Sequence, residues 1–194
     1  MLDENEWVIL VDESDQSFEF GPKLGTHETG ALHRAISVFV FNTSGELLLQ
    51  KRAACKYHSA GKWANTCCGH PRPNESSQSA AERRLYEEMG MRVDLKFGFK
   101  SRYEARLDND MIENEIPYLY FGVSDSLPQP NPDEVSAFEY VRLEHINDEL
   151  KRDAGRFSAW LIHYMDSHTN RISSYRDVLV AEMLGRQSGA SALA

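Results

Sequence analysis

The sequence predicts an α/β or α+β sandwich built as one compact domain. Short apolar segments typical of strands alternate along its 194 residues with segments of helical periodicity. The hydrophobic content of 41 % is ample for one buried core in a chain of this length. With no internal repeat, we expect a single domain over 1–194, with a core at about 30–165 and a helical extension at about 171–194.

The first half of the chain is expected to supply the middle of the sheet. Extended segments are predicted at 7–11, within 12–25, at 35–41 and at 46–52. The segment at 35–41 is apolar on both faces, as in a central strand, and 46–52 follows a turn as its hairpin partner. His27 and His33 fall in a glycine-bearing loop just before this central strand.

The clearest helical pattern runs over 74–89. It begins in cap-type residues and ends before Gly90, which stands at the usual terminator position. Apolar residues recur every four positions and form its buried stripe, at Ala81, Leu85 and Met89. Arg84 and Glu88 are also four residues apart, which puts a cation and a carboxylate on one edge of the helix.

Two segments of alternating polarity flank the turn residues 108–110 and are expected over 97–107 and 111–123. With those three residues as the loop, Tyr103 lies opposite Glu115 in an antiparallel pair. The alternation also places Glu113 and Glu115 on one face of their strand. The sequence therefore predicts a phenol and two carboxylates close together.

The C-terminal third is expected to add one strand and three helices after a proline-rich loop at 128–132. The predicted elements are a strand at 137–143 and helices at 146–152, 157–165 and 175–186, with a frayed tail at 187–194. Strands interleaved with helices in this way favour a layered arrangement.

Composition and charge narrow the classes of function. The formal charge of -9 argues against a whole-protein role on nucleic acid. Seven lysines and arginines against two glutamates over 51–84 form a basic island, which suggests a site for a small anion. The acidic N-terminus lacks the features of a signal peptide, and no apolar run approaches the ~18 residues of a membrane span. Three clustered cysteines are too few for a disulfide framework, so we expect a soluble, cytoplasmic protein with reduced thiols.

Histidines, glutamates and one thiol could form a reactive site near the basic island. Cys68 and His70 stand two residues apart, although a small buried cysteine beside a loop histidine is the simpler interpretation of that pair alone. Three imidazoles with two carboxylates would make a metal shell that suits Zn²⁺, Mn²⁺ or Fe²⁺ better than Mg²⁺. The residues of this shell would be His27, His33, His70, Glu113 and Glu115. From spacing alone, solvated surface side chains would be the preferred interpretation.

A spaced motif then resembles the Nudix box. From Gly69 the chain reads Gly, five residues, Glu75, seven residues and the run Arg-Arg-Leu-Tyr-Glu-Glu-Met-Gly-Met over 83–91. The box is Gly-x5-Glu-x7-Arg-Glu-U-x-Glu-Glu-x-Gly-U, where U is apolar, so Arg84 replaces its first clustered glutamate. In Nudix hydrolases that glutamate helps to hold the metals that activate water. A cation in its place counts against plain diphosphate hydrolysis.

Further motifs resemble one branch of this superfamily, the type 1 isopentenyl diphosphate isomerases. They are Trp-x-Asn-x-x-Cys-Gly-His-Pro at 63–71, Glu-Asn-Glu at 113–115 and Phe-Ser-x-Trp at 157–160. The resemblance covers about 21–164, and the joint occurrence of these motifs is far more specific than any one of them. It implies a mixed β-sheet sandwiched between α-helices. It also implies an enzyme that isomerises isopentenyl diphosphate to dimethylallyl diphosphate in isoprenoid biosynthesis.

The resemblance implies roles for individual residues. Moving the double bond requires protonation of one carbon and deprotonation of another through a tertiary carbocation, so two proton-carrying groups are needed. By resemblance these groups are Cys68 and Glu115, with Tyr103 assisting and Trp160 stabilising the cation. The diphosphate would be held by the cationic side chains of Lys23, Arg52, Lys56 and Arg84.

Two metals are implied in the same way. Mg²⁺ would join the diphosphate to Glu88 and to the Cys68 carbonyl. One transition metal, Mn²⁺ or Zn²⁺, would be held by the histidine and glutamate shell, in which Glu115 is also a proton-transfer group. The expected partner is the small-molecule substrate, with no nucleic acid and no membrane, and a monomer is expected in preference to a dimer.

Two other functions stay open on the sequence. A Nudix-type diphosphohydrolase is supported by Glu75, Glu87 and Glu88 and opposed by Arg84. A non-catalytic, metal-stabilised binding module would explain the histidines, but it gives no role to the Cys68 thiol.

Overall fold

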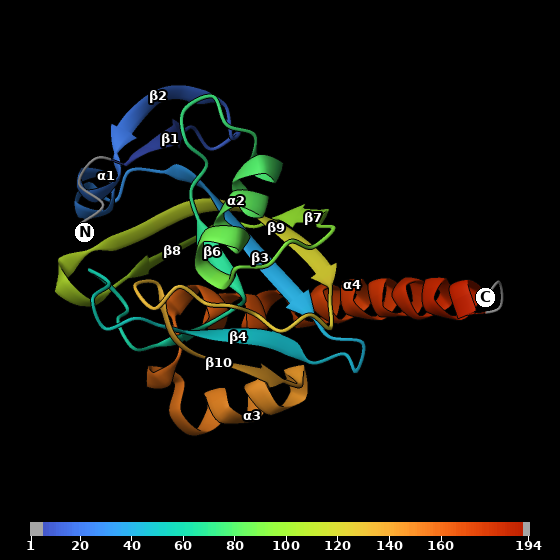
Figure 1. Ribbon diagram of the computed structural model, residues 1–194. Coiled ribbons are helices and arrows are strands. Elements are labelled where there is room, and N and C mark those ends of the chain that lie inside the picture. Colours follow the sequence, from blue (N-terminus) through green and yellow to red (C-terminus); the bar gives the residue numbers. More distant parts are fainter. Residues whose placement is uncertain (1–5, 192–194) are drawn as a thin grey trace.

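The computed structural model describes residues 6–191 and places one mixed sheet at the centre of the fold (Figure 1). Ten strands within the described residues join in that sheet. They are β1 (Trp7–Val11), β2 (Ser17–Pro22), β3 (His33–Phe41), β4 (Leu47–Arg52), β5 (Trp63–Ala64), β6 (Cys67–Gly69), β7 (Lys96–Lys100), β8 (Tyr103–Arg106), β9 (Ile112–Val123) and β10 (Val135–Val141). The helices are α1 (Lys23–Thr29), α2 (Ser77–Met89), α3 (Leu143–Asp153) and α4 (Ala159–Ser191), with 3-10 turns at Asp108–Asp110 and Ala154–Arg156. A mixed sheet between helices confirms the predicted fold class.

β3 is the central strand, as its two apolar faces predict. It pairs in parallel with β9 along its whole length, antiparallel with β6, and with β4 beside the turn. Because side chains alternate along a strand, Ile36, Val38 and Val40 pack with α2, whereas Phe39 and Phe41 pack with the start of α4. Helices therefore cover both faces of the sheet, and each face has its own apolar core.

The expected hairpin between β3 and β4 is confirmed only at its turn. Phe41 pairs with Leu47, but farther from the turn β5 pairs with β4 and β6 pairs with β3, so the segment 63–69 enters between the two strands. The hydroxyl of buried Thr66, in that segment, bridges them. It accepts from the Val40 N–H at 2.9 Å and donates to the Leu48 carbonyl at 2.7 Å, so the backbone groups of both strands stay satisfied.

The prediction that His27 and His33 lie in a loop is wrong. His27 lies in the last turn of the seven-residue helix α1, and His33 is the first residue of β3. Gly30 ends α1 in the left-handed conformation, with φ 69°, which glycine adopts without strain. Both histidines are therefore held by regular structure at the edge of the central strand.

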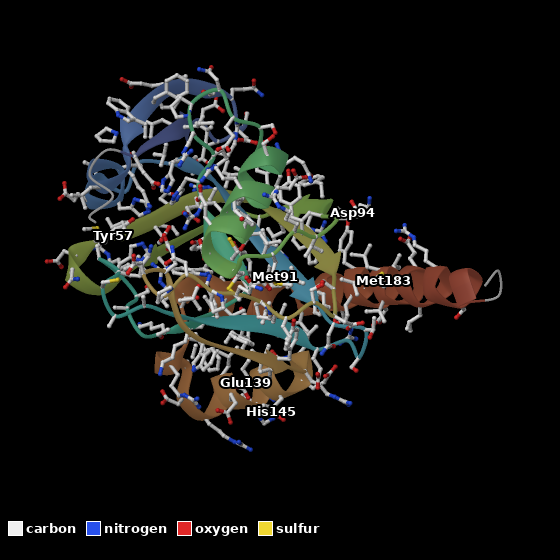
Figure 2. All side chains as sticks on the ribbon, in the orientation of Figure 1. Tyr57, Met91, Asp94, Glu139, His145 and Met183 are labelled. Carbon is white, nitrogen blue, oxygen red and sulfur yellow. The ribbon has the colours of Figure 1, made fainter. Side chains whose placement is uncertain are left out.

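The predicted helix over 74–89 is confirmed as α2. The Ser76 side chain accepts from the Ser79 N–H at its start, and Gly90 takes the left-handed conformation at its end. Its buried face includes Glu88 as well as apolar residues, and Met91, just beyond the helix, is buried in the same core (Figure 2). A carboxylate buried on this face is positioned toward the sheet.

The predicted register of the long hairpin is confirmed. Tyr103 pairs with Glu115, and both Glu113 and Glu115 are buried on one face of β9. The expected strand over 97–107 is split into β7 and β8 at Ser101, which lies opposite Pro117. The Ser101 N–H donates to the Pro117 carbonyl at 3.0 Å, but proline has no N–H to return the bond, so the ladder is interrupted there.

The C-terminal prediction is correct for β10 and α3 but wrong in placing two helices and a frayed tail after them. One helix, α4, continues from Ala159 to Ser191, and residues 192–194 of the predicted tail lie outside the described part. Tyr175 fixes its middle, stacking on Phe121 with ring centroids 4.6 Å apart and donating to the Gly98 carbonyl at 2.9 Å. Beyond this point α4 projects from the body of the protein (Figure 1). None of the helices within residues 6–191 combines the length and apolar character of a membrane span.

Candidate active site

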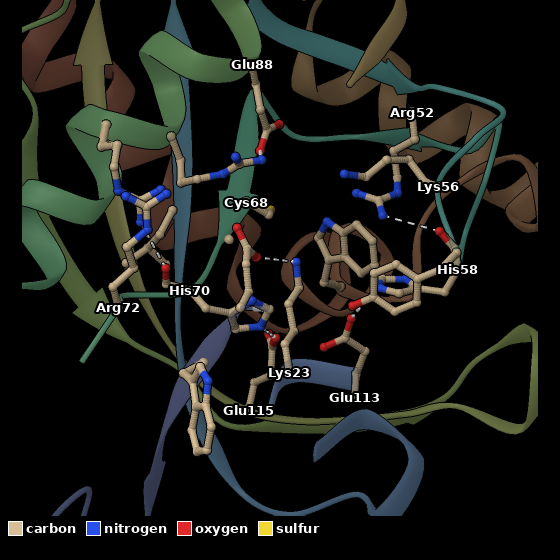
Figure 3. Close-up of a pocket in the computed structure, with 18 of the residues that line it drawn as sticks. Lys23, Arg52, Lys56, His58, Cys68, His70, Arg72, Glu88, Glu113 and Glu115 are labelled. Carbon is tan, nitrogen blue, oxygen red and sulfur yellow. Dashed lines mark hydrogen bonds and ion pairs between the residues drawn. The ribbon is translucent and has the colours of Figure 1, made fainter. Parts of the chain in front are cut away.

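A cavity of about 310 Å³ collects almost all of the predicted site residues (Figure 3). Its wall contains Lys23, Arg52, Lys56, Cys68, His70, Arg84, Glu88, Tyr103, Glu113, Glu115 and Trp160. His27 and His33 are fully buried and do not line the cavity, but they contact residues that do. Residues separated by more than one hundred positions in the chain therefore meet at one site.

Five of these side chains form the cluster that the sequence suggested as a metal shell. His27, His33, His70, Glu113 and Glu115 each offer one ligand atom, and these atoms all lie within 4.8 Å of one another. The cluster lies at the junction of α1, β3, β9 and the segment after β6. Three imidazole nitrogens and two carboxylate oxygens at this spacing could hold a metal ion.

The hydrogen bonds behind two of the imidazoles favour such a role. The Nδ1 atoms of His27 and His33 lie 2.7 and 2.9 Å from the carbonyl oxygens of Lys23 and Ala31. Because a carbonyl only accepts, each Nδ1 carries a proton, which leaves Nε2 as the atom of each ring that can ligate a metal. The Nε2 atom of His27 is buried and has no hydrogen-bond partner among the described residues. A buried imidazole nitrogen without a partner fits a metal ligand.

The pKa values of the cluster residues are shifted in different directions. Burial alone would raise the pKa of Glu115, but the hydrogen bond and charge of His33 outweigh it and lower the pKa to about 2. Burial lowers the pKa of His70 well below its usual value. For His27, burial acts to lower the pKa, yet the neighbouring Glu113 carboxylate raises it overall. Glu115 is therefore an ionised carboxylate at neutral pH.

Cys68 faces the cavity from β6, opposite Ser37 of β3. Its Sγ lies 3.2 Å from the Ser37 Oγ and donates to the Asn65 Oδ1 at 3.3 Å. Burial raises the pKa of the thiol to about 12, although its hydrogen bonds with Ser37 and Asn65 partly oppose the shift. The thiol is therefore protonated at neutral pH and held in one orientation.

The predicted diphosphate-binding cations line the cavity and carry carboxylate or carbonyl partners. Arg84 donates to Glu87 at 2.7 Å and to Glu88 at 2.6 Å, and it lies 3.3 Å from Glu134. Lys56 donates to the same Glu134 at 2.6 Å. An anion bound here would have to compete with these carboxylates for the cations.

The two remaining cations approach from other elements. Lys23, at the start of α1, pairs with Glu6 at 2.9 Å. Arg52, at the end of β4, lies 5.1 Å from the centroid of the Trp160 ring, and its buried Nε has no hydrogen-bond partner among the described residues. Trp160, in the first turn of α4, is 4 % exposed and packs in the core, so it is both a core residue and a cavity wall.

Several residues of the site were not identified from the sequence. Asn65 belongs to the Trp-x-Asn motif, which could have suggested its contact with Cys68. Gln50 donates to Glu88 at 2.6 Å, and Glu134 pairs with two cations, but neither stands in a recognisable motif.

His58 also lines the cavity, near Glu113, and its place within the basic island is the only signal of it in the sequence. Burial is the largest influence on His58 and lowers its pKa to about 2.

Comparison with known proteins identifies the family. The NUDIX domain model matches residues 31–161. An isopentenyl-diphosphate Delta-isomerase of Pectobacterium atrosepticum is 50 % identical over 153 residues, which cover 79 % of this chain and 86 % of that protein. Isopentenyl-diphosphate Delta-isomerase 1 of Aromatoleum aromaticum is 51 % identical, with coverages of 79 % and 87 %.

Solved structures agree on the fold. The DR0079 protein of Deinococcus radiodurans superposes with a TM-score of 0.66 at 19 % identity, over 79 % of this chain and 92 % of that one. A MutT protein of Methanosarcina mazei gives 0.58 at 20 % identity, over 70 % and 91 %. These likenesses concern the fold alone, whereas the sequence relatives confirm the resemblance drawn from the motifs. The chain carries a NUDIX domain and belongs to the isopentenyl-diphosphate Delta-isomerase family.

Proposed function

We propose that the protein isomerises isopentenyl diphosphate to dimethylallyl diphosphate by protonating and deprotonating the five-carbon skeleton. The observation that carries the proposal is the meeting, in one cavity, of a protonated thiol, an ionised carboxylate and a basic wall, in a chain of this family. The cavity of about 310 Å³ lies at the lower end of the usual range for small-molecule sites.

Cys68 and Glu115 are the two proton-transfer groups in this proposal. Cys68 holds a proton at rest and Glu115 can accept one. The enzyme therefore gives one proton and takes one as the double bond moves, and its total number of protons is unchanged. Tyr103 assists because its hydroxyl donates to the Glu115 Oε2 at 2.9 Å. Ser37 and Asn65 orient the Cys68 thiol through their hydrogen bonds with its sulfur.

Trp160 stabilises the tertiary carbocation that forms between the two proton transfers. An aromatic ring face attracts a cation by ~1 to 2 kcal/mol or more in a desolvated pocket. Arg52 already lies 5.1 Å from the centroid of this ring, so the ring has a cation beside it even without substrate. The ring contributes this attraction without a carboxylate that the cation could alkylate.

The diphosphate would be held by Lys23, Arg52, Lys56 and Arg84, and Glu88 with the Cys68 carbonyl would hold Mg²⁺ beside it. Bidentate guanidinium contacts suit phosphate oxygens, so Arg84 acts as a clamp where Nudix hydrolases carry a metal-binding glutamate. Glu88 is 3 % exposed and is fixed by Gln50 and Arg84, which would position it as a Mg²⁺ ligand.

A transition metal, Mn²⁺ or Zn²⁺, would be held by the histidine and glutamate cluster. When bound, it would fix the Glu115 carboxylate and lower its proton affinity. The chain's own contribution is the pair of Nδ1 hydrogen bonds that fix the tautomers of His27 and His33. Location in the cytoplasm, where the three free cysteines would stay reduced, and a monomeric state complete the proposal.

One assay separates isomerase from diphosphohydrolase. Purified protein is incubated with isopentenyl diphosphate, Mg²⁺ and Mn²⁺, and both dimethylallyl diphosphate and released phosphate are measured. We expect the allylic product without phosphate, and phosphate without the allylic product would overturn the proposal.

Two adjacent cysteines provide a matched test of the thiol. Cys68→Ala should abolish turnover and leave the bound transition metal unchanged, because the thiol is outside the metal cluster. Cys67→Ala removes a buried thiol from the core under α2 and should keep most of the activity. Near-full activity of Cys68→Ala would remove the thiol from the mechanism.

A further inference from the structure

His58 is a buried histidine that the proposed reaction does not use. It lies on the loop between β4 and β5, is 6 % exposed and lines the cavity (Figure 3). Its ring stacks on His27 with centroids 5.7 Å apart and meets Trp160 edge to face at 5.9 Å. Neither motif nor metal cluster accounts for an imidazole at this place.

The ring is directed at one oxygen of Glu113. The His58 Nε2 lies 3.6 Å from the Glu113 Oε1, which is just beyond hydrogen-bond length. The other carboxylate oxygen, Oε2, faces the His27 Nε2 at 3.7 Å and the Tyr103 hydroxyl at 3.5 Å. The two oxygens of Glu113 are therefore divided between His58 on one side and the metal cluster on the other.

The other nitrogen of the ring has a partner of its own. The His58 Nδ1 lies 3.4 Å from the hydroxyl of Ser59, which can donate to it. With the Ser59 hydroxyl as the donor, the ring proton lies on Nε2, on the side of the carboxylate. The backbone carbonyl of His58 also accepts from the Arg52 Nη2 at 3.2 Å, so the loop that carries the ring is tied to β4.

We propose that His58 is a positioning residue, whose Nε2 makes a polar contact of 3.6 Å with the Oε1 atom of Glu113 and so leaves Oε2 directed at the metal cluster. This inference rests on the proposed metal site. Groups that orient a metal ligand from outside the coordination sphere typically change metal affinity by about 10- to 100-fold when they are removed. His58 would act in that way on Glu113, and it would not itself touch the substrate or the metal.

Metal affinity provides a test that is independent of turnover. The dissociation constant for Co²⁺ is measured on the purified full chain by competition with a chromogenic chelator, for wild type, His58→Ala and His58→Gln. We expect His58→Ala to weaken Co²⁺ binding by about 10- to 100-fold. His58→Gln, whose amide can donate to Glu113 from nearly the same position, should stay within about 3-fold of wild type. His145→Ala removes an exposed histidine of α3 (Figure 2) and should leave the affinity unchanged.

The possible results separate this inference from the proposed function. Wild-type affinity in His58→Ala would overturn the positioning role. It would also be overturned if His58→Gln were as weak as His58→Ala, with an equal loss of thermal stability in the metal-free proteins, because the ring would then act only through packing. A wild-type protein that binds no Co²⁺ would overturn the metal site and this inference together. If the affinities follow the expected order but no isomerase activity is found, the proposed function fails and the role of His58 stands.

Discussion

The hydroxyl of Tyr103 donates a hydrogen bond of 2.9 Å to the Oε2 atom of Glu115, its direct cross-strand neighbour in the β8–β9 ladder. The Oε1 atom of the same carboxylate lies 2.9 Å from the Nε2 of His70 and 3.3 Å from that of His33. Each oxygen of Glu115 thus has its own environment. One belongs to the metal cluster, and the other is oriented by a phenol beside the cavity.

Removing the Tyr103 hydroxyl should affect chemistry more than binding. We predict that Tyr103→Phe lowers kcat by roughly 10- to 100-fold, because proton transfer by a positioned group contributes about 10²- to 10⁴-fold and only its orientation is lost. KM should change little, since the cationic wall is intact. Steady-state kinetics test this, with Tyr86→Phe on the exposed face of α2 as the control. A kcat equal to that of wild type would remove Tyr103 from the mechanism.

The protonation state of Cys68 can be measured by alkylation. Because burial raises the pKa of this thiol to about 12, the reactive thiolate is scarce at neutral pH and increases as pH rises. We predict that iodoacetamide modifies the exposed Cys55 well before Cys68 at pH 7.5, with mass spectrometry of peptides as the readout. The rate at Cys68 should increase about tenfold per pH unit up to pH 10. Rapid modification of Cys68 at pH 7.5 would show a thiolate instead.

Arg84 should act on substrate binding. Arg84→Gln removes the guanidinium that we assign to the diphosphate, so KM for isopentenyl diphosphate should rise by at least about 10-fold, as expected for the loss of a charge-assisted contact worth about 1.5–3 kcal/mol. The variant should also unfold at a lower temperature, because Glu88 and Glu134 lose a buried partner. Arg92→Gln, whose guanidinium stacks on Tyr86 outside the cavity, should keep the wild-type KM. An unchanged KM in Arg84→Gln would exclude the clamp.

Asp15 links stability to pH at the other side of the sheet. Burial would raise its pKa, but hydrogen bonds from Lys100, Tyr118 and Arg34 lower it below the ordinary 3.8. A lowered carboxylate pKa contributes stability that is present above the ordinary value and is lost as pH falls through the lowered one. Asp15 has a positive φ of 60°, which asparagine tolerates, so Asp15→Asn removes the charge without new backbone strain.

We therefore predict that Asp15→Asn lowers the free energy of unfolding at pH 7 by about 2 kcal/mol. The difference from wild type should shrink as pH falls below 4. Urea unfolding at pH 7 and pH 3 measures both values. An equal difference at the two pH values would mean that the charge of Asp15 does not stabilise the fold.

The parts of the site that can be predicted from the sequence are those fixed by residues close together in the chain. The pairing of Tyr103 with Glu115 follows from three turn residues and strict alternation, both of which are visible in the sequence. Glu88 and Arg84 share an edge of α2 because helical spacing fixes it. These relationships span few residues, so periodicity was sufficient.

The remaining features depend on tertiary contacts. A seven-residue helix such as α1 has too few turns for a periodic pattern, so the sequence does not reveal that His27 lies in a helix. β3 separates from β4 because β5 and β6 enter between them, with Thr66 bridging the two strands, and the middle of α4 is held by Tyr175 packing on Phe121. His58 reaches Glu113 only because its loop folds back over the cavity. No local pattern carries that information.

The deuterium content of the product tests the central claim, protonation and deprotonation at Cys68 and Glu115, most directly. Wild-type protein is supplied with isopentenyl diphosphate in D₂O, and dimethylallyl diphosphate is analysed by mass spectrometry at low conversion. We predict one deuteron in the newly formed methyl group, because the thiol, the phenol and any protonated carboxylate exchange with solvent before they deliver a proton. Dimethylallyl diphosphate that carries no solvent deuterium would contradict the account.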